Sequence, residues 1–241
     1  MIEILVDTHT HTNCSHHAYS TLQENIAAAK ERGLEMICMT NHAPAIPDSA
    51  HIWHFRTMQR LPRVIDGVKL LTGAEANLID KNGNLDLPLE DQKNMDLIIA
   101  SIHVPCYKRG TVEEHTNTYL GAIKNPYVTI IGHSGSPSFA YDIDTVVVAA
   151  REYNKCIEIN NNSYVARPRN AENCRNIALA CKKHGTKIVV SSDAHSCFEV
   201  GNFKYALEML EEIEFPQELI INTTAKKFEQ YLGELKLSRQ G

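Results

Sequence analysis

The chain has 241 residues, a length that suits one large domain or two small ones, and 43% of them are hydrophobic. Its net charge of -5 gives no reason to expect a nucleic-acid partner. The sequence contains no run of about 18 apolar residues, so we expect neither a transmembrane helix nor a membrane partner. The seven cysteines form no Cys-x-x-Cys pair, which favours reduced thiols and a cytoplasmic location.

Short β-rich runs alternate with helical stretches along the whole chain, a pattern typical of parallel βα units. The expected strands cover residues 2–6, 34–39, 67–72, 96–101, 128–131, 156–159 and 187–190, with a last short strand at 219–221. The first expected helix begins at the N-cap Ser20, with Gln23 three residues later, and ends at Gly33. Further helices are expected at 111–124, 142–154, 170–184, 203–212 and 224–232.

No repeat or linker interrupts this pattern, so we expect a single domain over residues 1–241. Seven or so strands joined by helical crossovers predict a closed or nearly closed α/β barrel, with a doubly wound open sheet as the alternative. Both architectures gather functional side chains at the carboxyl ends of the strands.

Groups that can bind a metal ion follow six of the seven main strands. Asp7-Thr8-His9-Thr10-His11 follows the first strand, and in an extended segment His9 and His11 point to the same side. Adjacent His16 and His17 lie in the next loop. The groups after the later strands are His42, Glu75, His103, His133, Asp193 and His195.

Nine of these groups are candidate ligands, and nine are too many for one tetrahedral ion, so the sequence predicts two or three divalent ions. They are His9, His11, His17, His42, Glu75, His103, His133, Asp193 and His195. Glu75 is the natural bridge, because its two oxygens can reach two ions. Imidazole and carboxylate ligands suit zinc, manganese or iron, and the lack of a thiolate favours a catalytic site with open positions. A hydroxide bound to such a centre is suited to phosphate ester hydrolysis.

These residues resemble the PHP (polymerase and histidinol phosphatase) family, whose mark is Asp-x-His-x-His after the first strand. Several stretches are similar to the YcdX-like bacterial phosphatase branch. They are His17-Ala18-Tyr19-Ser20, His51-Ile52-Trp53-His54-Phe55, Pro62-Arg63-Val64-Ile65-Asp66-Gly67, Glu75-Ala76-Asn77 and Glu158-Ile159-Asn160-Asn161. The resemblance covers essentially the whole chain. It implies a distorted TIM-like (βα)7 barrel, a trinuclear centre, usually of zinc, and phosphatase activity.

The resemblance also implies how the ligands divide between three ions. One ion takes His9, His11, Glu75 and Asp193, a second takes His17, His42 and His195, and a third takes Glu75, His103 and His133. We choose His17 over His16 because His17-Ala18-Tyr19-Ser20 matches the branch. The chain departs from the family at Asn41, where Asp is frequent. An asparagine still hydrogen-bonds a ligand imidazole but brings no charge.

Arginine suits bidentate phosphate binding, and two arginines follow the sixth strand, which lacks a metal ligand. Arg167 is the first choice to bind the substrate phosphate and Arg169 the second. Asp193 and His195 are candidates for assisting proton transfer, and no protein general acid is assigned. The expected substrate is a small phosphorylated metabolite.

Three other functions stay open. A phosphodiesterase or nuclease would use the same ions, although the chain shows no basic run for a nucleic-acid groove. The motifs do not separate histidinol-phosphate phosphatase from other monoesterases. A non-enzymatic metal-binding or polymerase-associated module is disfavoured because no ligand position is missing. Association into a homo-oligomer is also left open.

Overall fold

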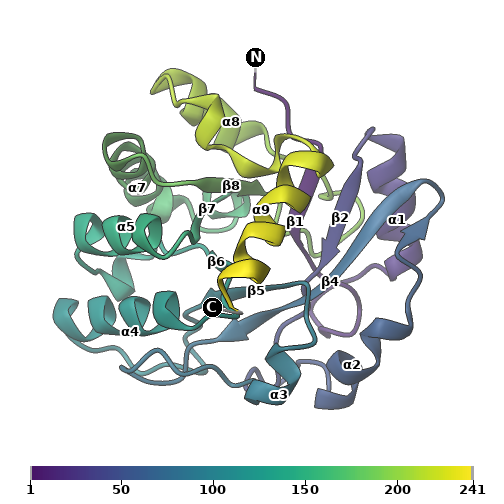
Figure 1. Cartoon of the computed structure of the whole chain (residues 1–241), viewed down its shortest axis with the longest axis horizontal. Coiled ribbons are helices and arrows are strands. Elements are labelled where there is room, and N and C mark those ends of the chain that lie inside the picture. The colour runs from purple at the N-terminus through teal and green to yellow at the C-terminus, as the bar shows by residue number, and fades with distance from the viewer. Residues whose placement is uncertain (1, 240–241) are drawn as a thin grey trace.

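The computed structural model describes residues 2–239 and is built around a mostly parallel sheet that curves into a nearly closed barrel (Figure 1). The strand order is β1-β2-β4-β5-β6-β7-β8, and β3 pairs antiparallel with β4 off this path. The strands are β1 Val6–Thr10, β2 Met36–Met39, β3 Val64–Ile65, β4 Val68–Asn77, β5 Leu97–Ser101, β6 Ile130–Ile131, β7 Cys156–Asn160 and β8 Ile188–Ser191. The expected α/β barrel with seven parallel strands is confirmed.

Helices follow the strands around the outside of the barrel (Figure 1). The α-helices are α1 Leu22–Glu31, α2 Ile52–Thr57, α3 Leu89–Gln92, α4 Val112–Lys124, α5 Ile143–Glu152, α6 Asn162–Val165, α7 Ala171–His184, α8 Lys204–Glu212 and α9 Ala225–Ser238. Short 3₁₀ turns cover Met58–Arg60, Pro137–Phe139, Pro168–Asn170, Gln217–Leu219 and Ile221–Thr223. Within residues 2–239, no helix is both long and apolar enough to cross a bilayer.

The interior of the barrel changes from apolar to polar along the strands. On β7, for example, the buried Cys156 packs with Phe228 and Tyr231 of α9, which lies across the barrel (Figure 1). Side chains two residues apart on a strand share a face, so Glu158 and Asn160 point inward beyond Cys156. Helix α9 therefore covers the apolar amino end of the interior, and the carboxyl end is left for polar side chains.

Side chains, and not a continuous ladder, close the barrel between β8 and β1. Asn222 accepts a hydrogen bond from the Val190 amide at 3.0 Å, and it donates to the carbonyl oxygens of Val6 at 2.8 Å and Val190 at 2.6 Å. The buried asparagine thus stands between two strands that do not pair directly. The backbone adds single bridges at Thr10–Ala194 and Ile188–Ile220.

Asp7 joins β1 to the loop after β8, at the carboxyl end of this seam between β8 and β1. Its carboxylate accepts hydrogen bonds from the Ser192 amide at 3.1 Å, the Ser192 hydroxyl at 2.5 Å and the Gly201 amide at 2.8 Å. Asp7 is fully buried, and this burial raises the pKa of its carboxyl group. The loop that it holds carries Asp193 and His195, so the closure of the barrel positions two candidate ligands.

Several predicted boundaries were wrong. The first strand is Val6–Thr10 and not 2–6, and β4 continues to Asn77 instead of ending at 72. Both errors have one cause: the carboxyl half of the interior is polar, so strand residues there resemble a loop in sequence. The expected strand at 219–221 is made of 3₁₀ turns with one bridge at Ile220.

The cap of the first helix was also misplaced by one residue. Thr21 and Glu24 form the capping box of α1, and Ser20 instead accepts a hydrogen bond from the Cys197 amide at 2.8 Å. The expected end of this helix is correct, since Gly33 follows it with a φ of 73°, a conformation that glycine adopts readily.

Candidate metal centre

Glu75 lies at the centre of the polar interior, fully buried at an inward position of β4. Its Oε2 atom is 2.7 Å from Nδ1 of His42, 3.3 Å from Nε2 of His9 and 3.6 Å from Nε2 of His11. Its Oε1 atom faces a different pair of imidazoles. The two carboxylate oxygens are thus directed to two separate sets of ring nitrogens.

The second set comes from the next two strand ends. Nε2 of His133 lies 2.7 Å from Oε1 of Glu75, and Nε2 of His103 lies 3.2 Å from the same oxygen. Because β4 and β5 pair in register from Gly73 and Leu97 onward, the ends of these strands come close together. Such a carboxylate has the arrangement needed to bridge two ions.

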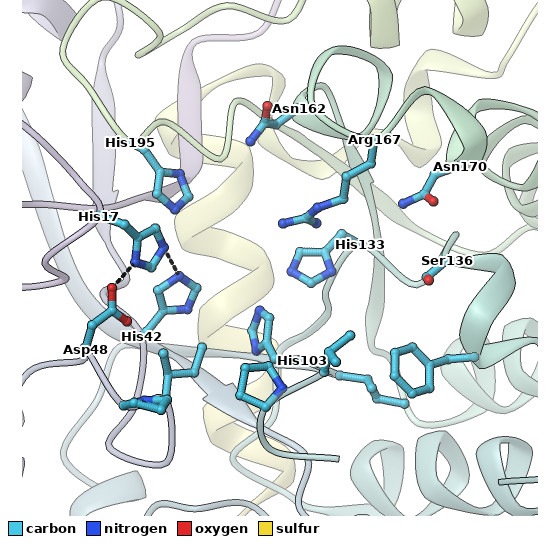
Figure 2. Close-up of a pocket in the computed structure, with 16 residues that line it drawn as sticks. His17, His42, Asp48, His103, His133, Ser136, Asn162, Arg167, Asn170 and His195 are labelled. Atoms are coloured by element: carbon cyan, nitrogen blue, oxygen red, sulfur yellow. Dashed lines mark hydrogen bonds and ion pairs between the residues drawn. The ribbon is translucent and has the colours of Figure 1, made fainter. Parts of the chain in front are cut away.

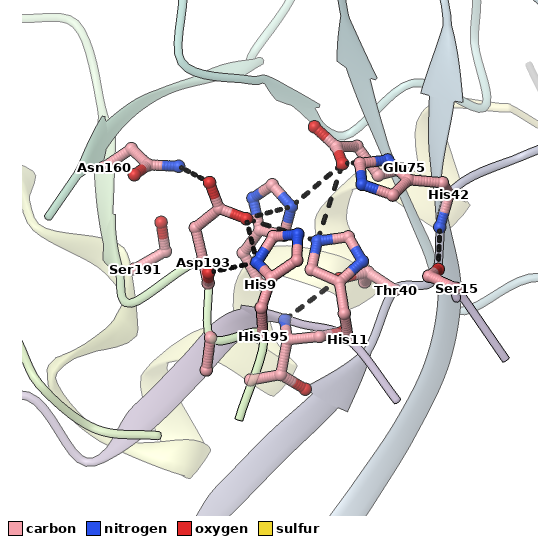
Figure 3. A network of polar contacts seen from close by, with 12 residues as sticks. His9, His11, Ser15, Thr40, His42, Glu75, Asn160, Ser191, Asp193 and His195 are labelled. Atoms are coloured by element: carbon pink, nitrogen blue, oxygen red, sulfur yellow. Dashed lines mark hydrogen bonds and ion pairs between the residues drawn. The ribbon is translucent and has the colours of Figure 1, made fainter. Parts of the chain in front are cut away.

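Asp193 completes a four-residue group with His9, His11 and Glu75 (Figure 3). Its Oδ1 atom is 3.4 Å from Nε2 of His9 and 3.2 Å from Nε2 of His11. Two ligand atoms bound at about 2.0–2.1 Å to one tetrahedral ion lie roughly 3.3–3.4 Å apart. The distances that join these two imidazoles to Asp193 and Glu75 span 3.2–3.6 Å, so the group has the dimensions of a zinc site.

Several buried polar atoms at this centre make no hydrogen bond of acceptable geometry to a described residue, although they lie close to one another. They are Nε2 of His9, Nδ1 of His11, Nδ1 of His42, Oε2 of Glu75 and Nε2 of His103. Leaving a buried polar atom without a partner costs about 1–3 kcal/mol, so a folded chain rarely tolerates several in one place. Bound cations would satisfy these atoms, and the donor set therefore fits a metal centre.

Three groups of side chains in the described residues bring their ligand atoms within 4.8 Å of one another. They are His11 with His42 and His195, His9 with His11 and Asp193, and His42 with Glu75 and His103. Neither His17 nor His133 belongs to them, although Nε2 of His17 lies 3.2 Å from Nε2 of His42. One group contains three of the four residues that the resemblance implies for one ion, and the other two contain His11 and His42 where the resemblance implies His17 and His133. The division between ions therefore stays a prediction.

The outer nitrogens of four imidazoles are held by oxygen acceptors. Nδ1 of each ring donates to one acceptor: His9 to Glu158 Oε1 at 2.7 Å, His17 to Asp48 Oδ2 at 2.6 Å, His103 to Asn77 Oδ1 at 2.7 Å and His195 to the Asp193 carbonyl at 2.9 Å. In the neutral imidazole, this bond fixes the tautomer and leaves Nε2 as the lone-pair nitrogen. A histidine prepared in this way is suited to bind a metal ion.

The comparison with protein families decides the affiliation of this barrel. The model of the PHP domain matches residues 7–166, which include seven of the nine candidate ligands and all but the first residue of the β1–β7 region. The chain belongs to the PHP domain family. The expected resemblance is therefore confirmed.

Known relatives of this PHP domain match over nearly its full length. A protein of Acetivibrio thermocellus named probable phosphatase is 45% identical over 235 residues, which cover 98% of each chain. A probable phosphatase of Clostridium novyi is 47% identical over 239 residues, again 98% of each chain.

A solved structure shares the fold at low sequence identity. It is the crystal structure of histidinol phosphate phosphatase from Lactococcus lactis in complex with zinc, L-histidinol and phosphate. The TM-score is 0.60 at 18% identity, and the match covers 88% of this chain and 94% of that chain. At this identity the similarity supports the barrel architecture alone.

Glu158 of this PHP domain has no role predicted from the sequence, yet it is a central acceptor of hydrogen bonds. Besides His9, its carboxylate accepts from the Ser191 hydroxyl at 2.6 Å and the His133 amide at 2.6 Å. A signal was present in the sequence: Glu158 is two residues after Cys156 in an expected strand, and the two therefore share a face. Glu158 thus links the ends of β1, β6 and β8.

Burial and charge oppose each other at the centre. Burial disfavours a charge on His9, but the carboxylates of Glu158, Glu75 and Asp193 outweigh it and raise the pKa of His9 well above its ordinary value. Burial likewise opposes the ionised form of Glu75, but the surrounding histidines hold the pKa of Glu75 well below its ordinary value. The protein therefore keeps this buried carboxylate ionised, as a metal ligand must be.

The expected contact of Asn41 with a ligand imidazole is not formed. Its Oδ1 accepts from the Thr12 amide at 2.8 Å, and its Nδ2 donates to the Thr12 hydroxyl at 2.9 Å and lies 3.2 Å from Nε2 of His54. Asn41 therefore fixes the loop after β1, which carries His16 and His17. Both histidines are exposed, but only His17 lines the pocket beside the centre.

A cavity of about 670 Å³ opens beside the histidines (Figure 2). Arg167 lines it and extends toward His133, with Asn162 and Asn170 on its two sides (Figure 2). Arg169 is exposed and does not line the cavity. Of the two arginines expected to bind phosphate, the structure thus brings only Arg167 to the site.

Proposed function

We propose that this PHP domain is a metal-dependent phosphatase that hydrolyses the monoesters of small phosphorylated metabolites. The enzyme class is supported by relatives that bear the name probable phosphatase over 98% of the chain, which confirms the expected hydrolase of phosphoric esters. The observation that carries the finer proposal is the position of Glu75, whose two oxygens face two sets of imidazoles at 2.7–3.6 Å.

Two or three divalent ions would be held at this centre. His9, His11, Glu75 and Asp193 would hold one, His103 and His133 with Glu75 another, and His17, His42 and His195 a third. Nitrogen and carboxylate donors without a thiolate fit Zn²⁺ first and Mn²⁺ or Fe²⁺ next. When bound, such ions supply an activated water at neutral pH and stabilise the charge on the phosphoryl oxygens.

The protein's own side chains would bind and orient the substrate. Arg167 offers a planar guanidinium for two phosphate oxygens, from the side of the cavity that faces His133. The role proposed for an arginine rests on Arg167 and not on the exposed Arg169. For proton transfer, His195 is better placed than Asp193, because it lines the cavity while the Asp193 oxygens face His9, His11 and Asn160.

A single assay separates the candidate functions. The zinc-loaded protein is given 4-nitrophenyl phosphate, bis(4-nitrophenyl) phosphate and L-histidinol phosphate, before and after removal of metal by a chelator. We expect hydrolysis of 4-nitrophenyl phosphate well above that of the diester, its loss with the chelator and its return with Zn²⁺. A faster diester reaction would indicate a phosphodiesterase. Activity confined to L-histidinol phosphate would indicate the function of the Lactococcus lactis protein.

Two substitutions test the centre directly. His9→Ala and Glu75→Ala remove a ring nitrogen and the carboxylate shared between the two sets. We expect both variants to fold, as judged by circular dichroism, and to lose measurable turnover. Full activity in either variant would refute the assignment of the centre.

A further inference from the structure

The cavity beside the metal centre has walls of different chemistry. One wall comes from the loops after β2, β5 and β6 and is apolar, and it is formed by Ile46, Pro47, Ile102, Val104, Pro105 and Phe139. The opposite wall comes from the segment after β7 and presents Asn162, Arg167 and Asn170. A molecule that fills the cavity therefore meets polar groups on one side and hydrocarbon on the other.

The apolar wall is packed in place. Ile46, Ile102 and Phe139 are each at least nine-tenths buried, although they also border the cavity. Small-molecule sites are mostly of this kind, with volumes of roughly 300–1,000 Å³ and preformed apolar walls. A cavity of about 670 Å³ is much larger than a phosphate group requires, so it has room for an organic group against this wall.

Few charged side chains are available for that organic group. Apart from the histidines, the lining residues include one acid, Asp48, and one base, Arg167. Asp48 already accepts a hydrogen bond from Nδ1 of His17 at 2.6 Å, and Arg167 faces the proposed phosphate position. A second charge on the substrate would be desolvated beside the apolar wall without a partner, which is unfavourable.

We infer that the substrates are phosphomonoesters of uncharged alcohols that carry a compact apolar or aromatic group. The ester phosphate is held at the histidines and Arg167, and the organic group packs against Ile46, Val104 and Phe139. The inference rests on the proposed phosphatase function and narrows its substrate class. It disfavours aminoalkyl phosphates and substrates with a carboxylate or a second phosphate.

The experiment uses three substrates that differ only at a remote position. Benzyl phosphate, 4-(aminomethyl)benzyl phosphate and 4-carboxybenzyl phosphate have similar leaving groups, so kcat/KM of the zinc-loaded enzyme reports how the cavity treats the remote group. We expect kcat/KM for benzyl phosphate to exceed that of each charged analogue by about ten-fold or more. Glycerol 1-phosphate has an organic group that is uncharged but polar. We expect its kcat/KM to fall below that of benzyl phosphate by a similar factor.

A second experiment introduces a charge into the apolar wall. Val104 is 67% exposed, so Val104→Asp should not disturb the fold, and it places a carboxylate at the edge of the cavity. We expect it to raise kcat/KM for the aminomethyl analogue relative to benzyl phosphate about ten-fold. Val64→Asp is the matched control, because Val64 is an exposed valine on β3 away from this cavity. It should leave the ratio unchanged.

The outcomes separate the substrate class from the enzyme class. Equal kcat/KM values for the three benzyl esters would overturn the inference while the phosphatase function stands. A preference for the aminomethyl analogue that Asp48→Asn removes would also overturn it and assign Asp48 as an amine site. If the zinc-loaded enzyme hydrolyses no phosphomonoester at all, the proposed function itself fails, and the inference fails with it.

Discussion

Nδ1 of His9 donates its proton to Oε1 of Glu158 across 2.7 Å, and both side chains are fully buried. His9 comes from β1 and Glu158 from β7, two strands that are not neighbours in the sheet. The bond crosses the barrel interior and turns Nε2 of His9 toward Glu75 and Asp193. A residue without a direct place among the candidate ligands thus orients one of them.

The first prediction concerns this contact. Glu158→Gln keeps the size of the side chain but removes the charge that stabilises the His9 proton, and we expect the affinity for zinc to fall about 10- to 100-fold. The affinity is measured by competition with a chromophoric chelator. Glu152→Gln, at the exposed end of α5, is the control and should bind zinc as the unmodified protein does. Unchanged zinc affinity in Glu158→Gln would show that Glu158 does not support metal binding through His9.

Asp7 provides a prediction about the seam between β8 and β1. Asp7→Asn leaves only one oxygen for the three donors on Ser192 and Gly201, so we expect a loss of about 1–3 kcal/mol in the free energy of unfolding. Urea denaturation measures it. Ser192→Ala removes only the hydroxyl donor and should lose less than Asp7→Asn. An equal loss in both variants would mean that the two amide hydrogen bonds contribute nothing.

The two arginines after β7 give a matched pair. Arg167→Ala should lower kcat/KM for 4-nitrophenyl phosphate about 10- to 100-fold, because a charge-assisted contact to phosphate is worth about 1.5–3 kcal/mol. Arg169→Ala should be close to the unmodified enzyme, since Arg169 is exposed and does not line the cavity. The reverse order of effects would show that the segment after β7 is arranged differently when substrate binds.

Lys155 yields a prediction about pH. It is 4% exposed, and its ammonium group donates to the Val128 carbonyl at 2.6 Å; burial lowers the pKa of Lys155 to about 8. The unfolded chain keeps the ordinary pKa of about 10.4, so between these values the unfolded state binds more protons than the folded state. The free energy of unfolding therefore rises with pH in this window. Below a pH of about 8, both states keep the proton and this pH dependence disappears.

The Lys155→Met variant isolates this effect. We expect the free energy of unfolding of the unmodified protein, relative to Lys155→Met, to increase by about 2 kcal/mol between pH 7.5 and 9.5. The comparison cancels the titration of tyrosines and cysteines, which both proteins share. Urea denaturation at the two pH values measures it. A constant difference between the proteins would show that Lys155 titrates normally in the fold.

The sequence predicted the strands better than their ends. Apolar runs mark the amino half of each strand, where the interior packs against α9, and these runs were recognised. The carboxyl half faces the polar centre, so His9 on β1 and Glu75 on β4 were placed after strands when they are part of them. The rule that buried strand residues are apolar fails where the barrel interior is built from histidines and acidic side chains, so strand ends there are predicted too early.

The sequence predicted the candidate ligands by residue type and by their position near strand ends, but it did not predict which of them lie together. His11, His42 and His195 lie on three separate segments, and only the closure of the barrel between β8 and β1 brings their ring nitrogens together. Glu158 was missed because an apolar run surrounds it. Alternation along β7 predicts that Glu158 faces the barrel interior on the same side as Cys156. A search for ligands at strand ends does not use this signal.

The central claim is that Glu75 stands between separate ion sites. Anomalous diffraction from crystals of the zinc-loaded protein, collected above and below the zinc absorption edge, tests it most directly. We expect two or three zinc peaks, with at least one beside each oxygen of the Glu75 carboxylate. A single peak on one side of Glu75, or no peak among these histidines, would contradict it.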